Sequence, residues 1–152
     1  MNALAILILA CAGDVDPVAM RAIIDIESSG HPWIIGGPQG AEAFSTREKA
    51  EVRLSQYISA DVRVDVGLSQ ISTDNFSWLS LNHENAFDPC GNISAGSSVL
   101  THNLKVVSPK AKSPADALVR AVSMYNTGSS VRGAQNGYVQ KFARAYARFS
   151  DQ

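Results

Sequence analysis

Glu27 is the residue of this sequence whose type and surroundings most suggest catalysis. It ends an apolar stretch, within the segment IDIESSG that spans residues 24–30. A carboxyl group beside apolar side chains is poorly solvated, and the partial negative charge of a helix carboxyl terminus disfavours its ionisation further. Both effects raise the pKa, and a Glu that stays protonated near neutral pH can act as a general acid. The alternative is an ordinary helix-end Glu that is hydrogen-bonded to its neighbours.

Two later segments offer neutral polar groups for a ligand. Residues 66–71 read VGLSQI, where the glycine allows close backbone approach and Ser69 and Gln70 can donate and accept hydrogen bonds. Residues 121–128 read AVSMYNTG, a helix that leads into a loop, and the Tyr125 hydroxyl there could bond the Glu27 carboxyl or a sugar. Taken singly, each segment also fits a buried turn or a buried Tyr that bonds backbone.

The composition narrows the class of ligand. With 152 residues the chain is expected to form one domain, residues 1–152, around one core. Thirteen Lys and Arg balance fourteen Asp and Glu, so we expect no nucleic-acid partner. Charged residues make up 18% of the chain, below the usual value of about 25%. A surface rich in neutral polar groups suits an uncharged polymer such as a glycan.

The cysteines and histidines do not suggest a metal site. Cys11 and Cys90 are far apart, and the three histidines show no metal-binding spacing, so we expect no metal and no cofactor. The two thiols are either both free and buried or joined in one disulfide. The disulfide is favoured, and it would imply an oxidising compartment.

The amino-terminal run NALAILILACA, residues 2–12, is as apolar as the core of a signal peptide but lacks a positively charged start. It is also too short to span a bilayer. We expect a first helix packed into the core, and the export signal stays unclear.

Capping and proline signals predict the remaining elements. The expected helices are one from Asp16-Pro17 to about Gly30, one opened by Ser45 and Glu48 and ending near residue 59, a brief one capped by Asp74 and running through Trp78, one over 88–107, one from Ser113-Pro114, and one over 138–149. Residues 33–44 and 126–137 are expected as loops, and 64–71 as an extended segment. The prediction is a mostly helical fold with a minor extended part.

Read together, the segments ESSG-x-P, GLSQI and YNTG resemble, in order and spacing, the soluble lytic transglycosylase family with the goose-type lysozyme fold. The resemblance is closer to the subfamily of type IV secretion and conjugation systems, through CAGDVDP at 11–17, FDPCGNISAG at 87–96 and NGYV at 136–139. It covers roughly residues 4–146. The chain departs from the family pattern at Ser69, where Met is frequent, at Ser29, where a second Gly is common, and in the loosely fitting stretch 33–37.

This resemblance implies a lysozyme-like fold and cleavage of the β-1,4 bond between N-acetylmuramic acid and N-acetylglucosamine, giving a 1,6-anhydro product. Glu27 would be the single acid and base, Tyr125 would hold its carboxyl, and Cys11 would pair with Cys90. The chain would act as a monomer in the periplasm on peptidoglycan strands, beside components of a secretion or conjugation machine. The implied substrate-binding residues are Ser28, Ser69, Gln70, Ile71, Tyr125 and Asn126.

Two alternatives stay open. Asp65 is expected to be a turn or capping residue, but a position in the cleft would permit a lysozyme-type hydrolysis with two carboxylates. The chain could also be a non-catalytic module that binds peptidoglycan or a secretion system, although such a module has no need of a poorly solvated acid.

Overall fold

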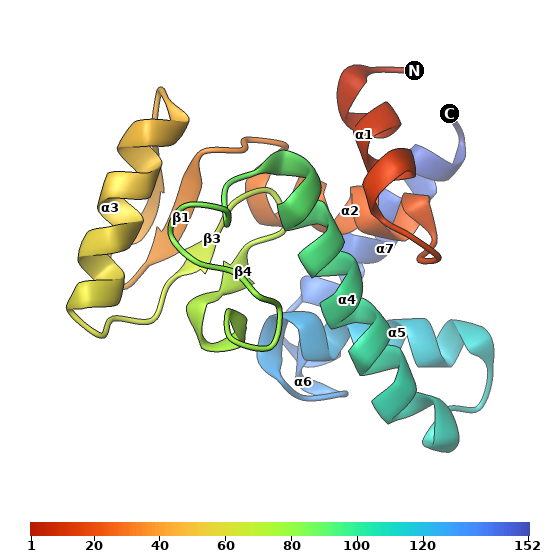
Figure 1. Cartoon of the computed structure of the whole chain (residues 1–152). Helices are drawn as coiled ribbons and strands as arrows, with labels where there is room; N and C mark the ends of the chain where they lie inside the picture. Colours follow the sequence, from red (N-terminus) through yellow and green to blue (C-terminus); the bar gives the residue numbers. More distant parts are fainter.

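The computed structural model describes residues 1–152 and is mostly helical, with one small sheet (Figure 1). This confirms the predicted fold class. The α-helices are α1 (Ala3–Cys11), α2 (Pro17–Ser28), α3 (Arg47–Ser59), α4 (Pro89–Val107), α5 (Pro114–Thr127), α6 (Arg132–Gln135) and α7 (Tyr138–Ser150). The strands are β1 (Ile34–Gly37), β2 (Gly40–Ala43), β3 (Asp65–Val66) and β4 (Ile71–Ser72), and the 3-10 turns are η1 (Thr73–Asn75) and η2 (Ser108–Lys110).

Three long helices begin at a capping side chain followed by proline. Asp16 caps α2, Asp88 caps α4 and Ser113 caps α5, each by accepting a hydrogen bond from a backbone N–H of the first turn. Proline suits the next position because it has no N–H to leave unsatisfied. These predicted helix starts are confirmed, as is the start of α7 at Tyr138.

Two predicted caps are wrong by one or two residues. Thr46, not Ser45, caps α3, because its hydroxyl accepts from the Lys49 N–H. Ser72, not Asp74, caps η1, which is a single 3-10 turn rather than a helix that reaches Trp78. Neighbouring polar residues compete for the same cap, and the backbone path into the helix decides between them.

The predicted loop over residues 33–44 is instead an antiparallel hairpin. Ile34 pairs with Ala43 and Gly37 with Gly40, so β1 and β2 enclose a tight turn at Pro38 and Gln39. The other edge of β1 pairs with β3, and the four strands lie in the order β2-β1-β3-β4. Because β1 is held from both sides, its glycines do not prevent strand formation. The segment 126–137, predicted as a loop, is also partly helical, since α5 reaches Thr127 and α6 occupies 132–135.

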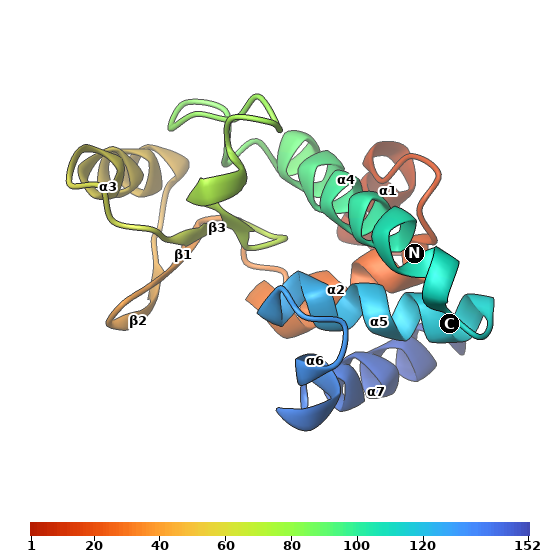
Figure 2. The ribbon, with the colours of Figure 1, turned by 90° about the horizontal axis from the view of Figure 1, so that it is seen from below.

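The interior consists of two hydrophobic clusters. The larger one gathers residues of α1, α2, α4, α5 and α7, and the smaller one lies between the sheet, α3 and the loop before α4. In Figure 2 the sheet and α3 lie to one side of α2, α5 and α7. Helix α4 contributes Ile93 and Leu100 to the larger cluster and Ala95 to the smaller one. It therefore links the two parts.

The predicted first helix is confirmed as α1, and Ile8 on it is buried in the larger cluster. A disulfide joins Cys11, the last residue of α1, to Cys90 in the first turn of α4. The predicted pairing is therefore confirmed, and the bridge fixes α1 against α4. None of the helices combines the length and the apolar character needed to cross a membrane.

Candidate active site

A polar cleft of about 360 Å³ lies between the helical part and the sheet. One wall comes from the ends of α2 and α5, and the opposite wall comes from β3, β4 and η1. Val99 of α4 also lines the cleft. The side chains that line it include Glu27, Arg63, Asp65, Gln70, Ile71, Asp74, Asn75, Tyr125 and Asn126.

Glu27 is the penultimate residue of α2 and is half-buried at the cleft. The helix ends at Ser28, and the next residue, Ser29, adopts the left-handed conformation at φ 53° and turns the chain, while Glu27 lines the cleft. The pKa of this carboxyl is raised to about 7, and burial is the main cause. A hydrogen bond from Tyr138 opposes the rise, and the charge of Asp65 adds a smaller increase. The direction matches the expectation from the sequence, and the group is therefore suited to both donating and accepting a proton near neutral pH.

Tyr138, not Tyr125, holds the Glu27 carboxyl. Tyr138 is the first residue of α7, and its hydroxyl donates to Glu27 Oε1 at 2.7 Å. The predicted role of Tyr125 in orienting Glu27 is therefore wrong. Tyr138 belongs to the NGYV segment quoted above for its family resemblance, but no local pattern links it to Glu27, which lies 111 residues away. Burial and the nearby Glu27 carboxyl raise the Tyr138 pKa, so its hydroxyl remains a donor.

Tyr125 instead fixes the opposite wall of the cleft. Its hydroxyl donates to the backbone carbonyl of Ser69 at 2.6 Å. Burial and the neighbouring Glu27 charge raise the Tyr125 pKa well above its usual value, so this hydroxyl also stays protonated. The ring still lines the cleft, where it can contact a ligand.

The Ser69 side chain does not face the cleft. It is fully buried, and its Oγ has no hydrogen-bond partner. It points toward Gly96 of α4, where a Cβ atom would lie 2.6 Å from Ser69 Oγ. The expected contact between this hydroxyl and a sugar is therefore not available in this conformation.

Asn92 of α4 holds the turn between β3 and β4. Its amide donates to the carbonyls of Val66 and Ala86 at 2.9 and 3.0 Å, and its oxygen accepts from the Ser69 N–H at 2.7 Å. Gly67 is required here, because it has φ +78° and a Cβ atom would lie 2.5 Å from the Asn92 amide nitrogen. The sequence reasoning assigned no role to Asn92 beyond its place in the FDPCGNISAG segment.

The other predicted binding residues divide into two groups. Gln70, Ile71 and Asn126 line the cleft, although Ile71 is almost completely buried. Gln70 uses its amide N–H groups on the carbonyls of Gly67 and Ile34, which leaves its oxygen for other contacts. Ser28 is buried outside the cleft lining, and its hydroxyl donates to the carbonyl of Leu68 at 2.8 Å, so it ties α2 to the β3–β4 turn.

Asp65 lies in β3 and lines the same cleft as Glu27. The prediction that it is a turn or capping residue is therefore wrong. Burial raises its pKa above the usual value, although Arg63, whose Nη2 lies 3.6 Å from Asp65 Oδ1, favours its charged form. The cleft lining thus includes three carboxyl groups, those of Glu27, Asp65 and Asp74. The first two lie in different surroundings, which is the arrangement that separates acid and base roles in glycoside cleavage.

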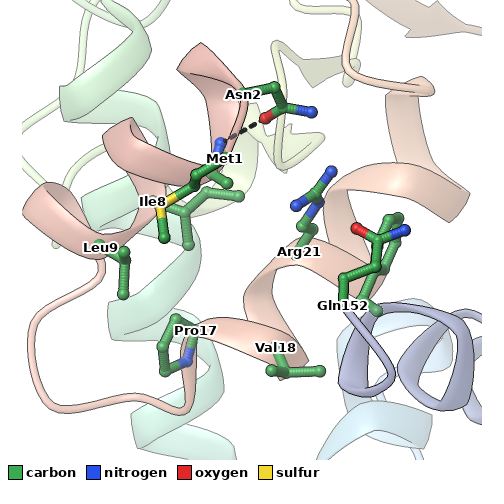
Figure 3. Close-up of a pocket in the computed structure, with 10 residues that line it drawn as sticks. Met1, Asn2, Ile8, Leu9, Pro17, Val18, Arg21 and Gln152 are labelled. Atoms are coloured by element: carbon green, nitrogen blue, oxygen red, sulfur yellow. Dashed lines mark hydrogen bonds between the residues drawn. The ribbon is translucent and has the colours of Figure 1, made fainter.

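A second cavity, of about 480 Å³, lies near the chain ends between α1, α2 and the end of α7 (Figure 3). Its lining is mostly apolar and its only charged side chain is Arg21, so it offers no acid for bond cleavage. No group of three or more His, Cys, Asp or Glu side chains is placed to hold a metal ion.

Comparison with known proteins agrees with this geometry. The family model described as the transglycosylase SLT domain matches residues 5–147. Protein virB1 of Agrobacterium fabrum is 32% identical over 137 residues, which cover 89% of this chain and 56% of that protein. The type IV secretion system protein virB1 of Brucella abortus is 27% identical over 146 residues, covering 86% and 58%. The chain thus spans a little over half the length of these relatives. With nearly its whole length matched, the chain belongs to the transglycosylase SLT domain family and has its lysozyme-like fold.

Proposed function

We propose that this chain is a peptidoglycan lytic transglycosylase that uses Glu27 as its only proton donor and acceptor. The observation that carries the proposal is a Glu at a polar cleft, held by Tyr138, with its pKa raised to about 7. A carboxyl with this pKa is present in both protonation states near neutral pH. Family membership and the polar cleft lining favour a glycan substrate.

The reaction needs one proton transfer in each direction. Protonated Glu27 gives its proton to the oxygen between N-acetylmuramic acid and N-acetylglucosamine as the bond from C1 to that oxygen breaks. The resulting Glu27 carboxylate then removes the proton of the muramic acid 6-hydroxyl while its oxygen bonds to C1. The products are a 1,6-anhydro sugar and a free 4-hydroxyl, and Glu27 ends protonated.

Asp65 supports a second candidate. A carboxylate in the same cleft can stabilise the positive charge that develops at C1, and it could also assist a water molecule, as in a lysozyme-type hydrolysis. We place hydrolysis second because the family matched is that of transglycosylases.

The cellular role follows from the relatives. Proteins named virB1 belong to type IV secretion systems in Brucella. We propose that this chain opens the cell wall locally for a secretion or conjugation apparatus, and that it works in the periplasm, where its disulfide is stable.

Product analysis tests these candidates. Purified peptidoglycan is digested with the protein, and the new sugar ends are identified by mass spectrometry. Anhydro ends support the transglycosylase, and reducing ends would show hydrolysis. Binding without turnover, at every pH tested, would indicate a non-catalytic module. Glu27→Gln should abolish cleavage, and cleavage at the parent rate would show that Glu27 is not the acid.

A further inference from the structure

Positive charge is concentrated in the carboxyl-terminal third of the chain. The segment 105–152 contains eight of the thirteen Lys and Arg residues but two of the fourteen Asp and Glu residues. Of these eight cations, Arg120 and Arg148 form ion pairs with carboxylates, and the other six have no carboxylate within 4 Å. This part of the protein therefore has positive charge available for an anionic ligand.

One hollow in this region adjoins the cleft. It has a volume of about 270 Å³ and lies between the end of α4, η2 and α5, which are packed together in Figure 1. Met124 and Gly128 line both this hollow and the cleft. The hollow therefore borders the cleft at these two residues, close to a group attached to a sugar bound there.

The lining of the hollow combines cations with apolar surface. Lys110 and Arg120 supply the charge, and Val106 and Met124 supply apolar contacts. The Nε of Arg120 is engaged by Asp116 at 2.9 Å, which leaves the other guanidinium N–H groups free to donate. The Lys110 ammonium has no carboxylate partner. This combination suits a short peptide with small apolar side chains and free carboxylates.

We propose that this hollow, lined by Lys110, Arg120 and Met124, binds the acidic peptide stem that muramic acid carries. The inference rests on the proposed function, because it takes the glycan in the cleft to be peptidoglycan. The stem leaves the sugar through a lactyl ether and contains carboxylates and methyl groups, which match the cations and the apolar wall. The protein thereby favours peptide-bearing strands over bare glycan.

The test compares two soluble substrates made from the same glycan strands, one with intact stems and one stripped of them by an amidase. Lys110→Glu should raise KM for stem-bearing strands about three- to tenfold with little change in kcat, and should leave stripped strands unaffected. Arg120→Gln should act in the same direction. Lys141→Glu, an equal charge change on the exposed face of α7, is the matched control and should change neither substrate.

An equal effect on both substrates, or no effect of Lys110→Glu, would overturn the proposal while the proposed activity stands. If the parent protein cleaves neither substrate, the proposed function fails, and calorimetric binding of a stem-bearing tetrasaccharide and its stripped form still tests the hollow. Lys110→Glu should then weaken the binding of the stem-bearing tetrasaccharide only. Equally weakened binding of both tetrasaccharides would contradict the inference.

Discussion

Replacing Tyr138 by Phe tests how the cleft sets the acidity of Glu27. The Tyr138 hydroxyl donates to Glu27 Oε1 at 2.7 Å and stabilises the carboxylate, so it opposes the effect of burial, and the resulting pKa is about 7. A hydrogen bond to a charged group contributes about 1.5–3 kcal/mol, and one pKa unit corresponds to about 1.4 kcal/mol. Since Glu27 is half-buried, water replaces part of the lost bond, and we expect a rise of about one unit.

The assay is the pH dependence of kcat/KM on soluble peptidoglycan strands. A general acid must be protonated in the free enzyme, so activity falls as the pH rises through its pKa. The alkaline limb of the parent should lie near pH 7. In Tyr138→Phe this limb should move to about pH 8, by the shift derived above.

Tyr125→Phe is the matched control. It also removes a tyrosine hydroxyl near Glu27, but this hydroxyl donates to the Ser69 carbonyl. Its alkaline limb should stay where the parent has it, even if the rate falls. An unchanged or more acidic limb in Tyr138→Phe, or an equal shift in both variants, would refute the assignment of Tyr138 as the partner that sets the acidity.

Four further substitutions probe the site. Asp65→Asn removes a charge that raises the Glu27 pKa, so the alkaline limb should move to lower pH, and an unmoved limb would contradict the coupling. Glu27→Gln should lower the rate by at least about a hundredfold, and it should also stabilise the fold at alkaline pH. The native pKa of Glu27 is raised, so its ionisation destabilises the parent fold above the unfolded pKa of 4.5. The stability gained by Glu27→Gln should therefore be absent below that pH, grow up to about pH 7 and then stay constant. Its upper bound in urea unfolding is about 3 kcal/mol. Ser69→Ala removes a buried hydroxyl without a partner and should raise the free energy of unfolding by about 1 kcal/mol, and a loss of stability would reveal a missed partner. Ser29→Gly relieves a left-handed serine at φ 53° and should add about 0.5–1 kcal/mol in thermal unfolding, while a lower melting temperature would show that Ser29 is not strained.

Local signals were sufficient for much of the fold, and they made Glu27 a candidate, whereas its predicted catalytic role came from the family resemblance. A capping Asp or Ser followed by proline marks the starts of α2, α4 and α5, because the cap and the missing N–H act within one turn. The direction of the Glu27 pKa shift was expected from local sequence, since Glu27 follows an apolar run at the end of its helix. The family resemblance added the Cys11–Cys90 disulfide, which no local rule fixes.

Features that depend on distant pairing were missed. The β1–β2 hairpin contains three glycines in eight strand residues and becomes a sheet because β3 pairs with the second edge of β1. Tyr138 reaches Glu27 only through the packing of α7 against α2. The direction of the Ser69 side chain follows from its fixed backbone, whose N–H donates to the Asn92 side-chain oxygen and whose carbonyl accepts from the Tyr125 hydroxyl. None of these relations leaves a pattern within one segment.

The cleft walls are joined by side chains that bond backbone carbonyls rather than a ligand. Ser28 of α2 bonds the Leu68 carbonyl, Tyr125 of α5 bonds the Ser69 carbonyl, and Asn92 of α4 bonds the Val66 carbonyl. Three helices thus hold one short turn, and the carboxyl that α2 carries is fixed relative to β3. Such rigidity is what an acid needs, because a proton donor must meet the glycosidic oxygen at hydrogen-bond distance. The polar groups of the GLSQI segment therefore serve largely to position the site, while Asp65, Gln70 and Asn126 keep polar atoms available in the cleft.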